Sequence, residues 1–303
     1  MIWLVGNKGM LGSEIAACMA REKFDFTGSD RNVDITSAAA IWSFAQGKSI
    51  QWIVNCAAYT AVDKAESEPD RAGQLNIEGP RNLGELAGKT GAGIVHISTD
   101  YVFSGNGRQP YREDDPVEPT GVYGRTKAQG EAELRNVCDR WIILRTAWLY
   151  GKNGSNFVYT MLRLMREREE LGVVTDQRGS PTWTADLAHA IVDIVREPPV
   201  RAGVYHFAGL GETSWFDFAL EIHRLGRKKG ILDRDCTIRP LTTDQYPTAA
   251  RRPAYSVLST DKVSRDFGIV ARSWKESLAD FFDDAFADAN GFERISTPVF
   301  KKP

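Results

Sequence analysis

The first half of the chain alternates short apolar runs with longer stretches of helical periodicity. The apolar runs have the length of buried strands and lie at Ile2 to Val5, Asp25 to Ser29, Trp52 to Asn55, Ile94 to Ser98 and Ile142 to Thr146. The helical stretches between them lie at Leu11 to Arg21, Asp70 to Lys89 and Val122 to Asn136. This succession of strand, helix and strand predicts an α/β fold built on a doubly wound parallel sheet.

The rhythm becomes less regular after about Trp148. Helical periodicity returns at Phe157 to Arg168 and at Ala185 to Arg196, with a loop at Asp176 to Pro181 between them. The chain contains no repeat of fixed period and no low-complexity linker. We therefore expect one domain over residues 1–150 and a smaller part formed mainly by residues 151–303, with some later elements returning to the first domain.

Composition excludes several classes of partner. The formal net charge is -2, so the chain offers no general attraction to nucleic acid or to an anionic membrane. The four cysteines stand far apart without metal or redox spacing, and we assign no metal ligands. The apolar run from Met1 to Val5 leads straight into glycine and lacks the form of a signal peptide or membrane span, which makes the cytoplasm the expected location.

A glycine-spaced loop follows the first predicted strand and opens the first predicted helix. Its glycines are Gly6, Gly9 and Gly12, and Met10 and Leu11 precede the last of them. Glycines in this context let the backbone approach a pyrophosphate, whose charge the amides of the helix N-terminus then stabilise. We expect a dinucleotide site of the Rossmann type in the first domain, although the spacing is G-x-x-G-x-x-G and a structural turn is the alternative.

Asp30 and Arg31 end the second predicted strand and bear on the choice of dinucleotide. A carboxylate at this position can accept hydrogen bonds from the adenosine ribose and favours NADH. The neighbouring guanidinium can instead bind the 2′-phosphate of NADPH. The residues leave both coenzymes open, and a turn or capping role for Asp30 is the alternative to either.

Tyr123 and Lys127 lie four residues apart at the start of a predicted helix, which places both side chains on one face. A free phenol has a pKa of about 10, and a nearby ammonium lowers that pKa by stabilising the phenolate. We therefore expect Tyr123 to give its proton to a carbonyl oxygen as hydride reaches the carbon, with Lys127 as its electrostatic partner. Such pairs also occur by chance on many helices.

The apolar run from Ile94 ends in hydroxyl groups, at the sheet edge where open parallel sheets bind ligands. Thr99 could donate a hydrogen bond to the substrate carbonyl and hold it against Tyr123. Without Tyr123 and Lys127, a strand-ending or turn-capping role would be the better interpretation. His96 lies within the apolar run and is interpreted as structural, and we assign no chemistry to any of the four histidines.

These motifs resemble the extended short-chain dehydrogenase/reductases and, more narrowly, the dTDP-4-dehydrorhamnose reductase family. The broad resemblance is carried by the glycine loop, by Ser98 to Phe103 and by Tyr123 to Lys127. The narrower one is carried by residues 57–66, 98–103, 145–151, 176–182, 252–253 and 256–258. One departure is Tyr255, which stands where the family has a smaller polar residue.

The resemblance implies reduction of the 4-keto group of a dTDP-6-deoxyhexulose by NADPH or NADH, giving dTDP-L-rhamnose for cell-envelope polysaccharide. By matching position, the residues that would line the cofactor are Gly9, Met10, Leu11, Asp30, Asp34, Ile35, Ala57, Ala58 and Tyr59, besides Tyr123 and Lys127. Thr99, Asp100 and Trp148 would meet the substrate.

Arginines in the less regular half are the candidates for the substrate diphosphate, because guanidinium binds phosphate in a bidentate manner. They are Arg178, Arg251 and Arg252, and exposure to solvent is the alternative role for each. The run from Trp215 to Ile222 has helical spacing and is interpreted as core. In some members of the family a homodimer holds a divalent ion such as Mg²⁺ through glutamates, which we cannot place in this chain.

Two rival functions share the same motifs. A nucleotide-sugar epimerase or dehydratase would return the hydride to the same substrate, yet Asp100 and Tyr101 do not resemble the acidic pair of the dehydratases. A non-catalytic regulatory subunit like that of methionine adenosyltransferase would need no turnover. The presence of Thr99, Tyr123 and Lys127 favours a reductase over both.

Overall fold

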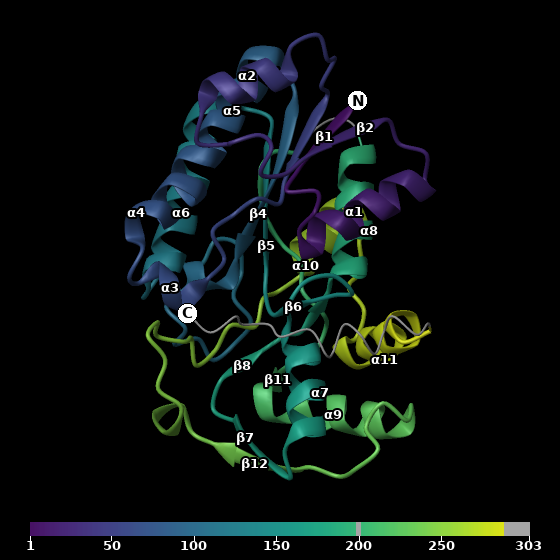
Figure 1. Cartoon of the computed structure of the whole chain (residues 1–303). Coiled ribbons are helices and arrows are strands. Elements are labelled where there is room, and N and C mark those ends of the chain that lie inside the picture. The colour runs from purple at the N-terminus through teal and green to yellow at the C-terminus, as the bar shows by residue number, and fades with distance from the viewer. Residues whose placement is uncertain (198–200, 288–303) are drawn as a thin grey trace.

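The computed structural model describes residues 1–197 and 201–287, and within them a central sheet has six strands in the order β10-β5-β4-β3-β1-β2 (Figure 1). The strands are β1 (Ile2–Val5), β2 (Phe26–Ser29), β3 (Trp52–Asn55), β4 (Gly93–Thr99), β5 (Trp141–Thr146) and β10 (Gly203–His206). Each neighbouring pair runs parallel. The strand order reverses between β1 and β3, where a doubly wound sheet opens a crevice for ligands. The predicted doubly wound parallel sheet is confirmed.

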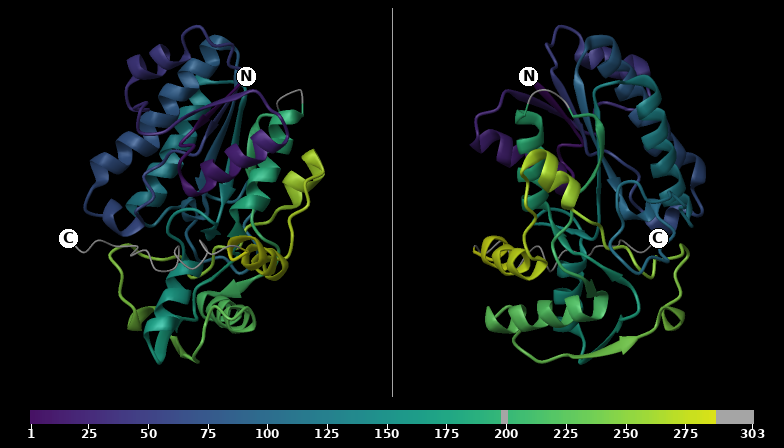
Figure 2. Two further views of the ribbon diagram at one scale, coloured as in Figure 1. Left: turned by 45° about the vertical axis from the view of Figure 1, so that its right-hand side comes forward. Right: turned by 180° about the vertical axis from the view of Figure 1, so that it is seen from behind.

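Helices cover both faces of this sheet (Figure 2). One face carries α1 (Met10–Arg21) and α8 (Thr184–Arg196), and the other carries α2 (Ala38–Ala45), α5 (Gly79–Thr90) and α6 (Val122–Val137). Successive side chains of a strand point to opposite faces, so Leu4 of β1 packs in the first core while Trp3 and Val5 pack in the second. The apolar strands of the first half are therefore buried on both sides.

The helix predicted from Asp70 to Lys89 is interrupted. The chain forms α4 (Pro69–Gly73), a π-helical segment η1 (Gln74–Glu78) and then α5, preceded by the short helix α3 (Val62–Ala65). π-Helical turns inside α-helices occur frequently at functional sites. Here the segment carries Asn76, which is fully buried and contacts the loop that follows β3.

A smaller lobe lies below the sheet in Figure 1. It contains α7 (Phe157–Glu167), α9 (Trp215–Lys228), α11 (Trp274–Ala285) and the strand pairs β7 (Glu170–Val174) with β12 (Thr237–Leu241), β8 (Arg178–Gly179) with β11 (Thr213–Ser214), and β6 (Leu149–Tyr150) with β9 (Thr182–Trp183). Its core is rich in aromatic side chains, among them Tyr150, Phe218 and Phe281. Two short 3-10 turns, η2 (Asp100–Val102) and η3 (Thr243–Gln245), and the helix α10 (Asp261–Phe267) complete the described elements.

Two later elements join the larger lobe. Strand β10 pairs with β5 at the edge of the central sheet, and α8 packs beside α1. The functional division at residue 150 stays a prediction, and residues 198–200 and 288–303 of the proposed second part lie outside the described residues.

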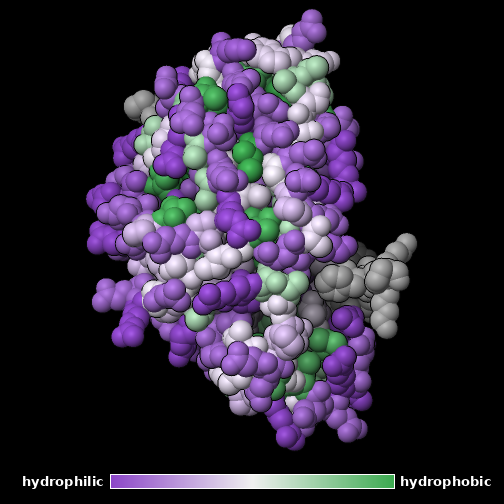
Figure 3. All heavy atoms as spheres, turned by 90° about the vertical axis from the view of Figure 1, so that its left-hand side faces the viewer, coloured by the Kyte–Doolittle hydropathy of each residue, from purple (hydrophilic) through white to green (hydrophobic). Residues whose placement is uncertain are grey.

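The molecular surface is mainly hydrophilic on the face shown in Figure 3, where apolar side chains are scattered among polar ones. Among the residues that the structure describes, no helix combines the length and the apolar character needed to cross a bilayer.

Candidate active site

The glycine loop closes tightly between the ends of three strands. Gly6 has a φ of +77°, and a Cβ at this position would lie 2.9 Å from the backbone nitrogen of Ala57. A Cβ on Gly12 would lie only 2.0 Å from the carbonyl oxygen of Gly6. The backbone nitrogens of Gly6 and Asn7 both donate to the carbonyl of Ser29, at 2.7 and 3.0 Å. Glycine is therefore required at positions 6 and 12 for the loop to fold back on itself.

The N-terminus of α1 opens directly from this loop. Gly9 precedes its first residue, Met10, and no side chain caps the helix. The first amides of the helix consequently remain available for an anion, as a pyrophosphate requires. Within the described residues, Asn7 Oδ1 is buried without a hydrogen-bond partner. Met10 is partly exposed while Leu11 packs in the core, so the loop fits a dinucleotide through its backbone.

Other predicted cofactor residues lie at the ends of β2 and β3. Asp30 is half-buried beside exposed Arg31, and Ala57 and Ala58 are half-buried after β3. Asp34 Oδ1 accepts hydrogen bonds from the backbone and side chain of Thr36, which forms the turn before α2. Ile35 is 4% exposed and packs in the core. Asp34 and Ile35 thus have structural roles already. Any contact with a cofactor would be a second role for them.

Asn76 holds the backbone that follows β3, and no sequence motif pointed to this role. Its Oδ1 accepts from the backbone of Tyr59 at 2.8 Å, and its Nδ2 donates to the Tyr59 carbonyl at 3.2 Å and to Thr126 Oγ1 at 3.1 Å. An asparagine within a helical pattern normally indicates an exposed position, and the π-helical turn instead aims it inward. The loop at Tyr59, which follows β3, is thereby tied to α6.

Tyr123 lies in the first turn of α6, whose N-terminus is held by Glu66. The Oε1 atom of Glu66 accepts from the backbone of Val122 at 2.7 Å, which supplies a side-chain partner for one free amide. Tyr123 is half-buried, is hydrogen-bonded to Thr99, and meets Tyr101 edge-to-face with ring centroids 5.4 Å apart. The strand end and the helix start therefore bring Tyr123 and Thr99 together.

Burial raises the pKa of Tyr123 above its usual value near 10, and the hydrogen bond with Thr99 opposes that rise. This shift runs opposite to the one we expected from Lys127, because the loss of solvent around the phenol outweighs the nearby groups. The phenol consequently keeps its proton at neutral pH, which is the state a proton donor needs.

Lys127 is almost completely buried, with 1% of its surface exposed. Its Nζ donates to the carbonyl oxygen of Ile97 at 2.7 Å and lies 3.2 Å from His96 Nε2. Burial lowers the pKa of Lys127 to about 8, while Glu131 and Cys56 oppose that change. His96, which we had interpreted as structural, is therefore in direct contact with a predicted catalytic residue.

Thr99 and Asp100 form one polar unit at the end of β4. Thr99 Oγ1 lies 2.9 Å from Asp100 Oδ1 and accepts from the backbone of Tyr101 at 3.2 Å. Burial raises the pKa of Asp100 to about 6, against the effect of hydrogen bonds from Ser256 and Thr99. The predicted substrate residues Thr99 and Asp100 thus lie beside Tyr123 as expected from the strand end.

Trp148 occupies a strained position between the two lobes. Its φ of +49° is unusual for a residue with a large side chain. Its ring stacks on Trp215 with centroids 3.4 Å apart and an interplanar angle of 4°. A Cβ on Gly179 would lie 2.4 Å from the Trp148 indole, so glycine is required there too. Trp215, predicted as core, is half-buried, packs against the core of the smaller lobe and stacks on Trp148.

The candidate arginines have acidic partners in this structure. Arg178 forms an ion pair with Glu212 at 3.1 Å, and its side chain is 48% exposed. Arg252 donates to Asp63 Oδ2 at 2.5 Å and to the hydroxyl of Tyr101 at 3.2 Å, whereas Arg251 is exposed. Arg252 is thereby held beside Tyr101, in the turn that follows Thr99.

A buried ion pair supports the site from behind. Glu131 on α6 binds Arg145 on β5 through two hydrogen bonds of 2.9 and 2.7 Å, and both side chains are nearly inaccessible. Ser98 Oγ donates to the same carboxylate at 2.5 Å. This pair fixes α6 against β4 and β5, and the sequence could not reveal it because the two charges lie on different elements.

Within the part of the chain that the structure describes, no group of three or more His, Cys, Asp or Glu side chains could hold a metal ion. We therefore derive no chemistry through the divalent ion that the family resemblance implied.

Three features define the class of protein: the Rossmann sheet, the glycine loop after β1, and the Tyr123/Lys127 pair on α6. Together they are those of a short-chain dehydrogenase/reductase. A narrower family can also be assigned. The family model described as "RmlD substrate binding domain" matches residues 1–286. The chain belongs to this family.

Similar proteins carry related names. The dTDP-4-dehydrorhamnose reductase of Escherichia coli strain K12 is 39% identical over 293 residues, which cover 94% of this chain and 98% of that protein. A Streptomyces antibioticus protein named "Probable dTDP-4,6-dihydroxy-2-methyloxan-3-one 4-ketoreductase" is 42% identical over 293 residues, 95% of this chain and 96% of that protein. The structure of dTDP-4-dehydrorhamnose reductase from Bacillus anthracis in complex with NADP matches with a TM-score of 0.88 at 37% identity, over 93% of this chain and 98% of that chain.

Proposed function

We propose that this protein reduces the 4-keto group of a dTDP-linked 6-deoxyhexulose with NADPH or NADH, giving dTDP-L-rhamnose from dTDP-4-dehydrorhamnose. The observation that carries the proposal is the position of Tyr123 in the first turn of α6, ahead of the buried Lys127 and beside the polar end of β4 at the ligand-binding edge of the sheet. The names of the relatives from Escherichia coli and Bacillus anthracis support the sugar and the reaction.

Tyr123 is the proposed proton donor to the developing alkoxide. Thr99 would orient the carbonyl oxygen toward the phenol, because its hydroxyl is fixed by Asp100 and by the backbone of Tyr101. Lys127 would bind the cofactor ribose and adjust the proton affinity of the site. When bound, the reduced nicotinamide supplies the hydride.

The proposed cofactor site uses the bare N-terminus of α1 and the glycine loop for the pyrophosphate. Asp30 and Arg31 stand where the adenosine ribose or its 2′-phosphate would lie, and Ala57 to Tyr59 would line the nicotinamide half. The complex of the Bacillus anthracis relative with NADP supports NADPH, and Asp30 keeps NADH open.

The proposed substrate site lies between the lobes. Trp148 would pack on the sugar, and Arg178 and Arg252 would bind the diphosphate after exchanging their present carboxylate partners. The name of the Streptomyces antibioticus relative supports a second candidate, in which a further deoxygenated dTDP-4-keto sugar is the substrate.

We also propose a cytoplasmic enzyme, since both of its proposed reactants are cytoplasmic metabolites, and a homodimer, as the family resemblance implies. The small net charge of -2 supports small-molecule partners over nucleic acid.

The decisive experiment generates the dTDP-4-keto sugar enzymatically, adds NADPH or NADH in separate reactions, and identifies the product by NMR. We expect dTDP-L-rhamnose with one coenzyme oxidised for each sugar reduced. Catalysis without net coenzyme consumption would indicate an epimerase or dehydratase. Absence of turnover with every dTDP-keto sugar, together with co-purification of a synthetase, would favour the regulatory-subunit alternative.

A further inference from the structure

Three buried polar side chains meet at the end of the central strands. Asn55 on β3 and His96 on β4 are direct partners in the register of the parallel sheet, and both are completely inaccessible. Asn55 Nδ2 lies 3.0 Å from His96 Nδ1, and His96 Nε2 lies 3.2 Å from Lys127 Nζ. The imidazole therefore bridges the strand end to the lysine.

The direction of this hydrogen-bond chain is set at its first link. The backbone nitrogen of Ala57 lies 3.0 Å from the Asn55 side chain and can only donate, so the atom facing it must be the carbonyl oxygen Oδ1. The amide nitrogen of Asn55 then faces His96 Nδ1 and donates to it. A neutral imidazole that accepts at Nδ1 carries its proton on Nε2.

The last link concerns Lys127. With a proton on Nε2, His96 can only donate toward the lysine nitrogen, whereas an ammonium group has no lone pair to accept it. A neutral amine satisfies every contact, because it accepts from His96 and still donates to the carbonyl of Ile97 at 2.7 Å. If His96 instead carried its proton on Nδ1, the side-chain amide of Asn55 would have to turn over to accept it. The NH₂ group of Asn55 would then face the N–H of Ala57, and two donors would meet.

We propose that His96 is a positioning residue that holds Lys127 as a neutral amine in the coenzyme-free protein, by donating a hydrogen bond from Nε2. The chain of donors that begins at Ala57 N–H determines this state.

The electrostatic surroundings agree with the proposal. The ionisable groups acting on Lys127 are Glu131 on its own helix, Cys56 after β3 and His96 on β4. Burial brings the pKa of the lysine to about 8, so that one accepted hydrogen bond, equivalent to about one pKa unit, decides its state near neutrality. Burial, the largest cause, holds the pKa of His96 well below its usual value, so the ring is neutral without any charge on Lys127.

The functional meaning of this arrangement rests on the proposed function. A neutral Lys127 places no positive charge near Tyr123, so it does not lower the pKa of the phenol. The coenzyme-free site is thus set for proton donation, the direction that reduction requires.

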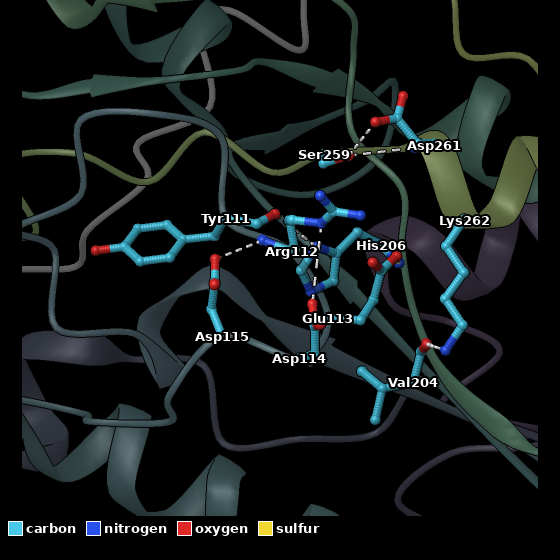
Figure 4. Close-up of polar contacts among 10 residues, drawn as sticks. All are labelled: Tyr111, Arg112, Glu113, Asp114, Asp115, Val204, His206, Ser259, Asp261 and Lys262. Carbon is cyan, nitrogen blue, oxygen red and sulfur yellow. Dashed lines mark hydrogen bonds and ion pairs between the residues drawn. The ribbon is translucent and has the colours of Figure 1, made fainter.

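The test is nitrogen NMR of protein with ¹⁵N-labelled histidine at pH 7.5, without coenzyme or substrate. His206 is an internal reference of the opposite kind, because its Nδ1 lies 3.1 Å from the carbonyl of Tyr111 and must carry the proton (Figure 4). We expect the proton of His96 on Nε2 and that of His206 on Nδ1. A spectrum in which His96 carries its proton on Nδ1 would overturn the proposal.

The variant Asn55→Asp reverses the chain, since a carboxylate can only accept and would place the His96 proton on Nδ1. Nε2 would then accept from Lys127 and favour its ammonium form. In ¹³C-lysine titrations, assigned with Lys127→Arg, we expect the pKa of Lys127 to rise by at least about one unit over wild type. An unchanged or lower pKa in a folded variant would contradict the proposal.

The matched control is Asn156→Asp, which introduces the same carboxylate at a buried position in the other lobe, where Oδ1 accepts from the backbone of Tyr159. We expect the His96 tautomer to match wild type in this variant, and a reversed tautomer there would remove the explanation through Asn55. Should Asn55→Asp not fold, the wild-type tautomer still decides. Because no measurement uses coenzyme or substrate, failure of the keto-sugar assay leaves this result independent.

Discussion

Burial is the main cause of the pKa shifts of the proposed catalytic and substrate-binding side chains. Tyr123 and Asp100 are shielded from water, and both have a raised pKa. Lys127 is equally shielded and has a lowered pKa, because loss of solvent always disfavours the charged form. Loss of solvent thus shifts the pKa of each group toward its neutral form, and hydrogen bonds help to determine where the protons lie.

Tyr123→Phe tests the proton donor. We expect the rate of keto-sugar reduction to fall by about 10²- to 10⁴-fold, because only the hydroxyl is removed. Coenzyme affinity, measured by fluorescence titration, and the unfolding midpoint should stay near wild type. An undiminished rate would remove Tyr123 from the mechanism.

Gly12→Ala tests the cofactor loop. A Cβ at this position would lie 2.0 Å from the Gly6 carbonyl, so the loop must move and lose its fit to a pyrophosphate. We expect NADPH affinity to fall by at least about tenfold in fluorescence titration, equivalent to about 1.4 kcal/mol. The control is Gly73→Ala, whose Cβ would make only an ordinary contact of 3.7 Å with Ile77. Equal affinity in both variants would refute the proposed role of the loop.

Helix α6 carries the proposed catalytic pair, and it is anchored at three points. Glu66 caps its first turn, Asn76 binds Thr126 in the middle, and Glu131 pairs with Arg145 further on. The partners come from α3–α4, η1 and β5, so the position of the helix depends on distant segments. Such anchoring holds Tyr123 and Lys127 in place before any ligand binds.

Glu131→Gln tests the buried anchor. The substitution leaves Arg145 buried with its charge uncompensated, since both side chains are about 2% exposed or less. We expect the free energy of unfolding to fall by about 3–5 kcal/mol in urea denaturation. Arg163→Gln is a suitable control because its ion pair with Glu167 is on the surface, where such pairs contribute about 0–1 kcal/mol. Similar losses in the two variants would contradict the assigned role.

The loop after β4 is held in place by segments that come from distant parts of the chain. The backbone around Tyr111 pairs with residues 257–259, and His206 of β10 contacts the carbonyl of Tyr111 (Figure 4). The ring of Tyr111 stacks on Phe103, with centroids 4.3 Å apart. The loop after β4 therefore rests on both the central sheet and the C-terminal segment.

His206→Phe tests how the contact between β10 and the Tyr111 loop responds to acid. Burial lowers the pKa of His206 from 6.5 to about 3, so between those values the unfolded chain binds the proton that the folded protein excludes. Stability consequently falls as pH decreases through that window, by up to about 1.4 kcal/mol per pH unit from this residue. Chemical denaturation from pH 6.5 to pH 4 should show a shallower decline in the variant. An identical slope would show that His206 is not the responsible group.

Periodicity and glycine spacing predicted most of the larger lobe. Strands β1 and β3 have the predicted bounds, and α1 and α6 differ from prediction by one residue at an end. The glycine loop and the strand end at Thr99 were also found, because these signals are local. Helix α2 was not predicted, and although some later elements were expected to return to the first domain, β10 was not identified as one of them, since neither carries a distinctive local pattern.

The amino-acid sequence by itself determined the alternating strands and helices, the glycine loop after β1, and the spacing of Tyr123 and Lys127. Each of these features depends on neighbours within a few residues. Only the tertiary structure decided that Asn55 and His96 reach Lys127, that Glu131 meets Arg145, and that Trp215 supports Trp148. Those contacts join separate elements, and the same side chains in a linear pattern are indistinguishable from ordinary core or surface residues. Burial, which sets their protonation, exists only once the chain has folded.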